Sequence, residues 1–314
     1  MNDVFSGKNM QVAMATDQNY ADFAYIAVFS MLYWQKQTQK SQNTLHLMYD
    51  HLTAETLERF EKLLQDHGWL FNPIPIEDAF FEEWPAMRWS KQTYYRLILP
   101  DMFPEMEKMI YVDCDILFLD DIRELWDIPL NGHPVAAVPG TLAAEHRKTL
   151  GLQDGVPYFN AGVMVYNLKL MHQQDRTREF IRLFQEYAGR LKYPDQDILN
   201  VAFQKQCCYL PLRWNLYSSV YRNPPVPGVY TEAEGLAALT SPGIVHFTGA
   251  HKPWRFKKSN HHPYSYAFYQ FVQKSGVSKA LSHKLFWKFL LQRKIAKPKK
   301  NVPWKPSQIR RFKL

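Results

Sequence analysis

Several sequence features are scarce or missing in this chain of 314 residues, and each absence narrows the class of protein. No run of 18 or more apolar residues occurs, which excludes a transmembrane helix. The N-terminus lacks the basic stretch and apolar run of a secretory signal. Cysteine occurs only as Cys114, Cys207 and Cys208. An odd number with two neighbours argues against a disulfide framework and for a reducing compartment. We therefore expect a soluble, cytoplasmic protein.

Acidic residues are missing from the end of the chain. From Gly235 to Leu314 there are 17 Lys plus Arg and no Asp or Glu. The preceding 234 residues hold the other 21 basic residues and all 30 acidic ones, a balance of −9. A basic tail on an acidic body suits the binding of phosphates or anionic lipid. A solvated tail without a partner explains the charge equally well.

Short apolar runs alternate with helical stretches through most of the chain. This alternation predicts an α/β fold with a mostly parallel sheet, whose ligands bind at the carboxyl ends of the strands. Strands are expected at 11–15, 45–49, 135–138, 163–166 and 244–247, and one more within 108–118. Helices are expected at 20–34, 53–67 and 177–191, and a basic one at 279–294.

The expected strand within 108–118 carries the clearest chemical signal. Its apolar run is interrupted by Asp113, Cys114 and Asp115. Residues two apart on a strand point the same way, so both carboxylates can face one point. Buried carboxylates repel each other unless a cation lies between them, and oxygen ligands suit Mn²⁺ or Mg²⁺. The position between apolar runs favours a metal site over two purposeless buried charges.

The loop after the first expected strand is a candidate nucleotide site. It consists of Ala15, Thr16, Asp17, Gln18 and Asn19, followed by Tyr20. The start of a helix after a strand is a common place for a bound nucleotide. Ordinary capping of that helix by Asp17 or Asn19 is the alternative interpretation.

Two further polar segments are candidates for ligand contact. Asn160 and Ala161 lie in the sequence Phe-Asn-Ala-Gly, where small residues let a ligand approach, although Asn and Gly also form turns. Asp195, Gln196 and Asp197 follow a proline that opens a helix. Capping explains Asp195 alone, but three polar residues exceed what a cap requires.

The segment after the last expected strand contains His246, Gly249 and Lys252. Imidazole can bind a metal, glycine lets the backbone approach a phosphate, and lysine neutralises phosphate charge. A histidine in isolation is more often structural. Three such residues within seven positions favour a functional site.

In this order, the motifs resemble the bacterial family 8 glycosyltransferases of the lipopolysaccharide galactosyl- and glucosyltransferase type. The resemblance runs from about 12 to about 264. Its motifs are Ala-x-Asp-x-Asn-Tyr, Thr-Tyr-x-Arg, Asp-x-Asp, Phe-Asn-Ala-Gly, Asp-Gln-Asp-Ile-Leu-Asn and His-x-x-Gly-x-x-Lys-Pro-Trp. It implies a GT-A catalytic domain over 1–264 and a basic, aromatic-rich helical extension over 265–314, which would attach to a membrane or an acceptor.

The resemblance also implies roles for individual residues. Asp17 and Asn19 would hold uridine, within a donor site that also includes Ala15, Thr16, Tyr20, Cys114 and Ala161. Arg96 would contact the donor, and Gly249 and Lys252 its phosphates. Asp113, Asp115 and His246 would bind Mn²⁺, with Mg²⁺ as the alternative. Asn160, Asp195 and Gln196 would contact the sugar of a UDP-hexose. Gln196, nearest the anomeric carbon, would be catalytic together with Asp195 and Asp197.

The implied reaction is transfer of a hexose, galactose ahead of glucose, with retention of configuration, to a lipid-linked or protein-linked glycan. Pro139 and Gly140 stand where related enzymes often carry an acidic residue, so the acceptor cannot be carried over. A nucleic-acid-binding protein would explain the tail but not a buried Asp-x-Asp, so nucleic acid is not expected as a partner. A non-catalytic, membrane-associated nucleotide scaffold is the other alternative, opposed by the intact His246, Lys252 and Asp195.

Overall fold

The computed structural model describes residues 9–35, 42–82, 84, 90–223, 225–249, 252–255, 262–278, 281–283 and 285. The chain forms two compact units. The first comprises Met1–Gln18, Thr38–Asp113 and Leu125–Leu210, and the second Asn19–Gln37, Cys114–Glu124 and Pro211–Leu314.

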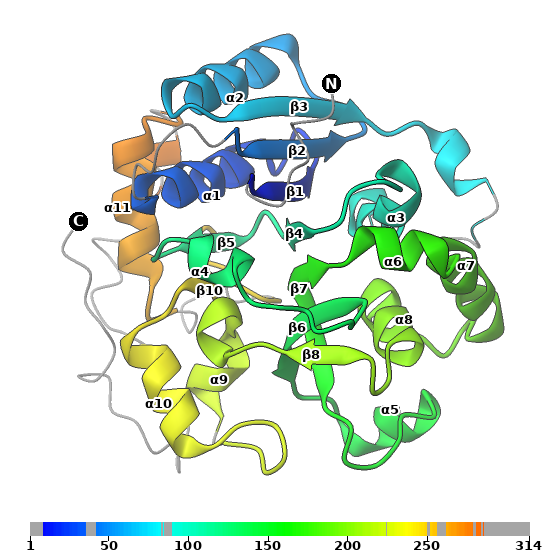
Figure 1. The fold of residues 1–314 in the computed structure, drawn as a ribbon. Helices are drawn as coiled ribbons and strands as arrows, with labels where there is room; N and C mark the ends of the chain where they lie inside the picture. The colour runs from blue at the N-terminus through cyan, green and yellow to red at the C-terminus, as the bar shows by residue number, and fades with distance from the viewer. Residues whose placement is uncertain are drawn as a thin grey trace. The chain divides into compact units, whose positions relative to one another are not determined.

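A seven-stranded sheet forms the first unit, with the order β3-β2-β1-β4-β7-β6-β8 (Figure 1). Its strands β1, β2, β3 and β4 pair in parallel, as do β6 and β8, whereas β7 runs antiparallel to β4 and β6. The sheet is therefore mostly parallel, as predicted. The strands are β1 (Gln11–Thr16), β2 (Thr44–Tyr49), β3 (Leu70–Pro75), β4 (Met109–Val112), β6 (Val135–Gly140), β7 (Tyr158–Tyr166) and β8 (Cys207–Tyr209).

The central strands are short apolar runs because both faces of the sheet are covered. Every residue of β1, β4 and β6 is buried. Strand β3 lies at the edge of the sheet and is partly exposed, and it tolerates Pro73 and Pro75. Proline lacks the N–H that an inner strand must donate, so an edge is where it fits.

Helices and 3-10 turns join these strands. Thr53 caps α2, and its hydroxyl accepts a hydrogen bond from Thr56 N. Pro194 occupies the first turn of α8, where its missing N–H costs nothing. The helical elements are α2 (Ala54–Asp66), η1 (Asp78–Phe81), η2 (Lys91–Leu97), α3 (Leu99–Met102), α5 (Ala144–Thr149), α6 (Leu168–Gln173), α7 (Arg176–Glu186) and α8 (Pro194–Ala202). In the sequence, α4 (Arg123–Trp126) begins in the second unit and ends in the first.

A smaller sheet with the order β5-β10-β9 organises the second unit. Strand β10 pairs antiparallel with β5 and parallel with β9. Around Trp254, aromatic rings pack closely: its ring stacks on Phe23 with centroids 4.1 Å apart and also contacts Phe247 and Phe268. The elements are β5 (Ile116–Phe118), β9 (Leu216–Tyr217), β10 (Ile244–His246), α1 (Ala21–Trp34), η3 (Leu212–Asn215), α9 (Ser218–Arg222), α10 (Glu232–Thr240) and α11 (Ser265–Ser275).

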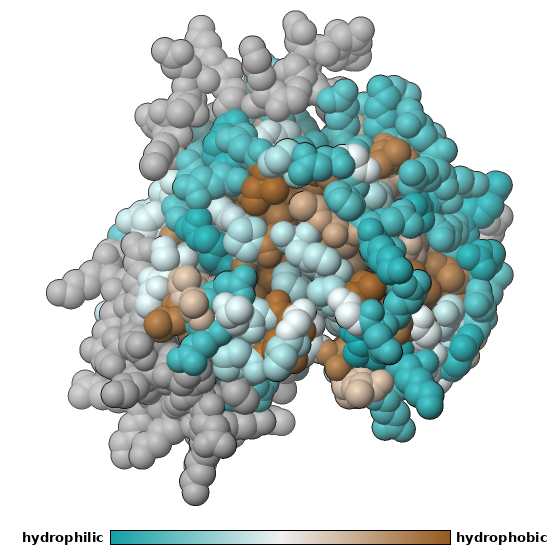
Figure 2. Space-filling view, turned by 60° about the horizontal axis from the view of Figure 1, so that its bottom comes forward, coloured by the Kyte–Doolittle hydropathy of each residue, from teal (hydrophilic) through white to brown (hydrophobic). Residues whose placement is uncertain are grey.

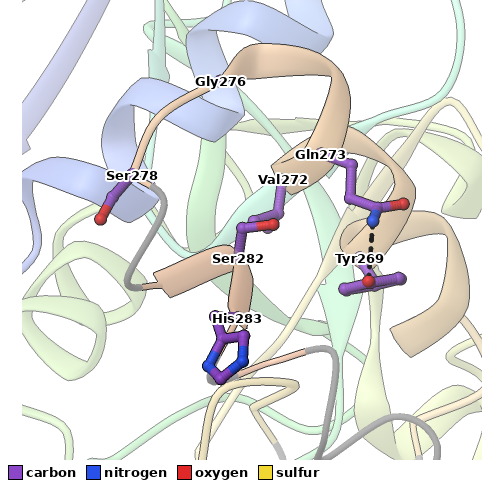
Figure 3. Close-up of a pocket in the computed structure, with 7 residues that line it drawn as sticks. All are labelled: Tyr269, Val272, Gln273, Gly276, Ser278, Ser282 and His283. Carbon is purple, nitrogen blue, oxygen red and sulfur yellow. Dashed lines mark hydrogen bonds between the residues drawn. The ribbon is translucent and has the colours of Figure 1, made fainter.

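Helix α11 packs on α1 through Phe271, whose ring contacts Phe29 and Tyr33. At the C-terminal end of α11 lies a cavity of about 340 Å³ (Figure 3). Its wall includes Tyr269 and Gln273, and Gln273 Nε2 donates a hydrogen bond of 2.8 Å to the Tyr269 hydroxyl. None of the predicted site residues lines this cavity.

Hydrophilic residues predominate on the face shown in Figure 2. Few large hydrophobic side chains are exposed among the described residues, namely Tyr33, Leu70, Phe80, Tyr193, Tyr209 and Tyr266. In the part of the chain that the structure describes, no helix has both the length and the hydropathy needed to cross a bilayer.

The predicted elements at 11–15, 45–49, 135–138, 244–247, 20–34 and 53–67 are confirmed within two residues. The helix predicted to reach 191 ends at Glu186, and Gly189 in the turn beyond it adopts φ +79°. The strand predicted at 163–166 begins at Tyr158, so the alternative of a turn at Phe-Asn-Ala-Gly is wrong. Most of the helix predicted at 279–294 lies outside the described residues, and the domain boundary at 264 stays a prediction.

The single interrupted strand predicted within 108–118 is corrected to two strands in different sheets, β4 and β5. At Asp113 the backbone N–H still donates to Gly162 O beside β7, whereas Asp115 O already accepts from Phe247 N beside β10. The polar triplet is therefore the crossing from one sheet to the other. Strand alternation does not explain how its carboxylates point, because the triplet belongs to neither strand.

Candidate active site

Arg96, on η2, organises the polar residues at the carboxyl end of β4. Its guanidinium donates to Asp113 Oδ1 (2.7 Å), to the carbonyl oxygens of Ala161 (2.7 Å) and Thr93 (3.0 Å), and lies 3.2 Å from Asp195 Oδ2. Only 5% of Arg96 is exposed. Burial by itself lowers the pKa of this guanidinium, but the neighbouring carboxylates raise it well above its usual value. Arg96 is thus a permanent buried cation shared by two carboxylates.

Asp195 lies in the first turn of α8 and is 7% exposed. Burial raises its pKa to about 6, opposed by the charge of Arg96 and assisted by that of Asp113. Removal from water disfavours the charged carboxylate more than one shared guanidinium favours it.

Gln196 is held by hydrogen bonds at both ends of its carboxamide. Its Oε1 accepts from Asn160 Nδ2 and from Ala161 N, each at 3.0 Å. Its Nε2 donates to the Tyr158 hydroxyl at 2.9 Å. Asn160 is in turn oriented by Gly162 N, which donates to Asn160 Oδ1 at 3.1 Å. Because backbone N–H groups can only donate, they fix which end of each amide is oxygen.

Asp197 is fully buried and accepts four hydrogen bonds. The Tyr158 hydroxyl donates to Oδ1 at 2.7 Å. His146 Nε2 and the backbone N–H groups of Lys192 and Tyr193 lie 2.9, 2.8 and 2.9 Å from Oδ2. Each carboxylate oxygen therefore has donors that compensate for lost water.

An irregularity in β7 presents these backbone groups to α8. Between Ala137 and Val138 the pairing of β6 with β7 jumps from Met164 to Asn160. One step along β6 thus spans four residues of β7, as in a bulge. The extra length frees carbonyl and N–H groups of the Phe-Asn-Ala-Gly segment to bond Arg96, Asp113 and Gln196 instead of β6.

His246 ends β10 in the second unit and is 4% exposed. Its Nδ1 lies 3.0 Å from Asn215 Oδ1, and its Nε2 lies 3.1 Å from Asp115 Oδ1. A hydrogen bond donated by Nδ1 to Asn215 makes Nε2 the nitrogen that faces the carboxylate and that a metal would bind. This arrangement is typical of a metal-binding histidine, whose second nitrogen is fixed by a neighbouring oxygen.

Lys252 provides a second partner for Asp115. Its ammonium group donates to Asp115 Oδ2 and to Phe247 O, the latter at 3.1 Å. Burial alone would raise the pKa of Asp115, but His246 and Lys252 hold it well below its usual range. Asp115 is therefore ionised whenever the protein is folded near neutral pH.

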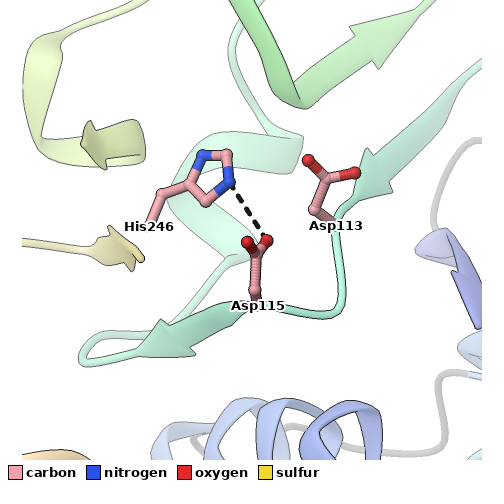
Figure 4. Close-up of side chains that lie close together, drawn as sticks. All are labelled: Asp113, Asp115 and His246. Atoms are coloured by element: carbon pink, nitrogen blue, oxygen red, sulfur yellow. Dashed lines mark ion pairs between the residues drawn. The ribbon is translucent and has the colours of Figure 1, made fainter. Parts of the chain in front are cut away.

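Asp113, Asp115 and His246 can offer one ligand atom each to a common ion (Figure 4). The three ligand atoms lie within 4.8 Å of one another. Two carboxylates and one imidazole suit Mn²⁺, and the hard oxygens also suit Mg²⁺. The residues present thus fit the predicted metal.

The predicted nucleotide residues lie at the carboxyl end of β1 and in the turn that follows it. Ala15 and Thr16 are buried, and Asp17 follows them directly. Tyr20 is the N-cap residue of α1, without a side-chain capping bond, and its hydroxyl accepts from Arg255 Nη2 at 3.1 Å. Asn19 is exposed in the same turn.

Gly249 and Cys114 complete the predicted donor residues. Gly249 has φ +65°, a left-handed conformation that side chains disfavour, and open space surrounds the place of a Cβ. Cys114, between the two aspartates, is half-buried and is not part of a disulfide.

Comparison with known proteins identifies the family. Residues 11–258 match the sequence profile described as "Glycosyl transferase family 8". This match covers most of the chain. The protein belongs to glycosyltransferase family 8.

Relatives of this glycosyltransferase include proteins of similar length. General stress protein A of Bacillus subtilis is 27% identical over 274 residues, which cover 84% of this chain and 93% of that protein. A lipopolysaccharide 1,2-glucosyltransferase of Escherichia coli is 27% identical over 254 residues, covering 79% and 74%. The crystal structure of the galactosyltransferase LgtC with donor and acceptor sugar analogues has a TM-score of 0.75 at 24% identity, covering 88% and 100%. The last likeness confirms the predicted GT-A fold.

The predicted site residues of the glycosyltransferase thus fall into connected groups. Arg96 gathers Asp113, Ala161 and Asp195, and Gln196 joins Asn160 to Asp197 through Tyr158. In the second unit, Asp115, His246 and Lys252 form one cluster.

Four residues that contact these groups were given no role by the sequence analysis: His146, Tyr158, Asn200 and Asn215. Two of them carried a signal. Tyr158 lies two positions before Asn160, so strand alternation places both on one face. Asn200 lies one helical turn after Gln196, and its Nδ2 donates to Gln196 O and Phe159 O. Neither His146 nor Asn215 has a neighbouring motif to mark it.

Proposed function

We propose that this family 8 glycosyltransferase is a retaining, metal-dependent hexosyltransferase that uses a UDP-hexose donor. The observation that carries the proposal is the Asp113, Asp115 and His246 group, with Asn215 fixing the imidazole and Lys252 on Asp115. A site for a divalent cation beside a buried lysine suits a diphosphate leaving group.

Asp113, Asp115 and His246 would hold Mn²⁺, or Mg²⁺ in its place. When bound, the ion neutralises negative charge on the departing diphosphate. Lys252 would bind the same phosphates with its ammonium group, and Gly249 would let the backbone approach them. Asp17 and Asn19 would hold the uridine, with Ala15, Thr16 and Tyr20 around it, and Cys114 and Ala161 would line the donor.

The transferred sugar would lie against Asn160, Asp195 and Gln196. Both lone pairs of Gln196 Oε1 are engaged by Asn160 and Ala161, whereas Nε2 donates one hydrogen to Tyr158 and has a second hydrogen. In this arrangement Gln196 offers the sugar a donor. Its oxygen becomes available to a developing positive charge only if Asn160 turns away.

The proposal of retention rests on the lack of a suitable base among the polar residues around Arg96 and Gln196. Inversion needs a base opposite the leaving group, with room for the acceptor hydroxyl. Asp197 is fully buried with four donors, Asp113 and Asp195 share Arg96, and Gln196 is a poor base. We expect an α-linked product from an α-linked donor. The anomeric proton signal in NMR measures this directly, and a β linkage would contradict it.

For the acceptor we propose a cell-surface glycan of the lipopolysaccharide type, as the name of the Escherichia coli relative suggests. Glucosyl and galactosyl enzymes both occur among the similar proteins. We place galactose ahead of glucose as the donor sugar, and a screen of UDP-sugars followed by linkage analysis decides between them.

Donor hydrolysis tests the proposal most simply. UDP-galactose or UDP-glucose should be hydrolysed with Mn²⁺ present and not with EDTA. Asp115→Ala should abolish transfer and Mn²⁺-dependent UDP binding, because it removes a metal ligand, while thermal unfolding still shows a folded protein. Asp101→Ala, at an exposed carboxylate paired with His172, is the matched control and should keep its activity.

Two outcomes would contradict the proposal. Full turnover by Asp115→Ala or in excess EDTA would rule out the metal site. Metal-dependent UDP binding by the unmodified protein, without turnover of any UDP-hexose, would favour a nucleotide-binding scaffold instead.

A further inference from the structure

The Tyr158 hydroxyl lies between the side chains of Gln196 and Asp197, the two residues that follow Asp195 in the sequence. Tyr158 is 2% exposed, at the start of β7. Its hydroxyl donates to Asp197 Oδ1 at 2.7 Å and accepts from Gln196 Nε2 at 2.9 Å. A single buried hydroxyl thus connects the amide proposed to face the sugar with a carboxylate that has no exposure.

Backbone donors fix the direction of the hydrogen bonds that link Gln196, Tyr158 and Asp197. The backbone N–H groups of Lys192 and Tyr193 require an acceptor at Asp197 Oδ2, and an ionised carboxylate accepts at both oxygens. The Tyr158 hydrogen therefore points to Asp197 Oδ1, which leaves its oxygen to accept from Gln196 Nε2. At the other end, Ala161 N requires the oxygen of Gln196.

We propose that Asp197 and Tyr158 are positioning residues that set the orientation of the Gln196 carboxamide toward the donor sugar. This inference rests on the proposed function of Gln196. It reassigns Asp197 from the sequence-predicted role of a catalytic residue, since a fully buried carboxylate that already accepts four hydrogen bonds has no exposed oxygen to present to a sugar.

His146 ties a loop to the same carboxylate. Helix α5, in the connection between β6 and β7, has no buried residue, yet His146 Nε2 reaches Asp197 Oδ2 at 2.9 Å. A conformational change in that connection would therefore alter the hydrogen bonding of Asp197 and, through Tyr158, the orientation of the Gln196 carboxamide.

Three variants test this relay, the hydrogen-bonded connection from Asp197 through Tyr158 to Gln196. Tyr158→Phe removes the link and should lower kcat roughly tenfold with little change in the donor KM, because one orienting bond is lost. Asp197→Asn should be worse, roughly a hundredfold. Its oxygen must still face Lys192 and Tyr193, so its NH₂ faces Tyr158. The Tyr158 hydroxyl hydrogen then has an acceptor only if the Gln196 carboxamide rotates so that its oxygen faces Tyr158.

The double variant is decisive. Tyr158→Phe removes the hydroxyl hydrogen that would rotate the Gln196 carboxamide, so it should raise the kcat of Asp197→Asn back to roughly the level of Tyr158→Phe alone. Tyr166→Phe is the matched control, since Tyr166 is buried in the same strand and its hydroxyl donates to Met164 Sδ. It should leave kcat unchanged, and the melting temperatures show whether each variant folds.

A second readout does not depend on turnover. The side-chain amide signals of Gln196, identified by their loss in Gln196→Glu, should shift in the ¹⁵N–¹H spectrum of Tyr158→Phe and of Asp197→Asn, and not in Tyr166→Phe. If the unmodified protein turns over no UDP-hexose, the proposed function fails while this spectrum still decides the relay.

Two results would overturn the inference. Unchanged Gln196 signals and kcat in Tyr158→Phe would show that Gln196 needs no such positioning. Loss of turnover in Asp197→Asn that Tyr158→Phe does not relieve would assign Asp197 a direct part in the reaction.

Discussion

At the scale of single residues, Lys252 forms an ion pair with a carboxylate that a bound metal would also need as a ligand. It donates to Asp115 Oδ2, while His246 faces Oδ1. The other predicted aspartate ligand, Asp113, forms an ion pair with Arg96. Each of these half-buried carboxylates thus has its own cationic side chain, which offsets the cost of partial burial.

Lys252→Met is expected to change metal and nucleotide binding in opposite directions. Without the ammonium group, Asp115 lacks a competing cation, so Mn²⁺ alone should bind roughly tenfold more tightly. UDP in the presence of Mn²⁺ should bind more weakly, because a phosphate contact is lost. Isothermal titration calorimetry measures both affinities.

Lys274→Met, on the surface of α11, is the matched control for this change and should alter neither affinity. Weaker binding of Mn²⁺ alone by Lys252→Met would mean that Lys252 supports the metal site instead of competing for it.

At the scale of elements, a polar ladder crosses β1, β2 and β3. His46, 2% exposed, lies between Gln11 and Asn72: its Nε2 is 2.8 Å from Gln11 Oε1, and its Nδ1 is 2.8 Å from Asn72 Nδ2. The amide of Asn72 donates to Nδ1, so the neutral ring carries its proton on Nε2. Burial lowers the pKa of His46 to about 4.

Unfolding should therefore become easier as the pH falls from about 6.5 to about 4. In that window the unfolded chain takes up a proton at His46 and the folded chain does not. The loss amounts to at most about 3 kcal/mol and stops below the folded pKa. Urea unfolding at pH 7 and pH 4.5 measures it, with His46→Gln expected to weaken the pH dependence.

His51→Gln, at an exposed histidine just after β2, serves as the comparison and should keep the full pH dependence. An equal pH dependence in the unmodified protein and in His46→Gln would show that other groups are responsible.

At the scale of the whole molecule, charge is divided along the chain, and we propose that the basic end attaches to anionic lipid. The segment 286–314 contains ten Lys plus Arg and no acidic residue. Each basic residue near such a surface contributes about 1 kcal/mol, weakened by salt. This segment lies outside the described residues. Val277 and Leu285 just before it are buried, so a deletion should begin after Leu285.

Deletion of 286–314 should release the protein from vesicles that contain phosphatidylserine and leave Mn²⁺-dependent donor hydrolysis intact. Co-sedimentation at low and high salt measures the binding. Equal sedimentation of the full-length and shortened chains would contradict the proposal. A shortened chain that fails to fold would show that the segment belongs to the core.

The amino-acid sequence by itself determined where most strands and helices lie. Buried strands need apolar runs, and the runs at β1, β2, β6 and β10 are short enough to exclude helices. It also predicted the polar residues of the candidate site, because Asp, His, Lys and Gln placed beside apolar runs have few structural reasons to be there. Their order along the chain was enough to indicate the family.

Only the tertiary structure decided what each of these residues contacts. The partner of Asp113 is Arg96, 17 positions away, whereas the partner of Asp115, two residues later, is Lys252, 137 positions away. Likewise, Tyr158 meets Gln196 across 38 positions and His146 meets Asp197 across 51. Local spacing cannot give such pairs, because strand order and the β7 bulge determine which distant groups share a buried site and must satisfy one another's hydrogen bonds.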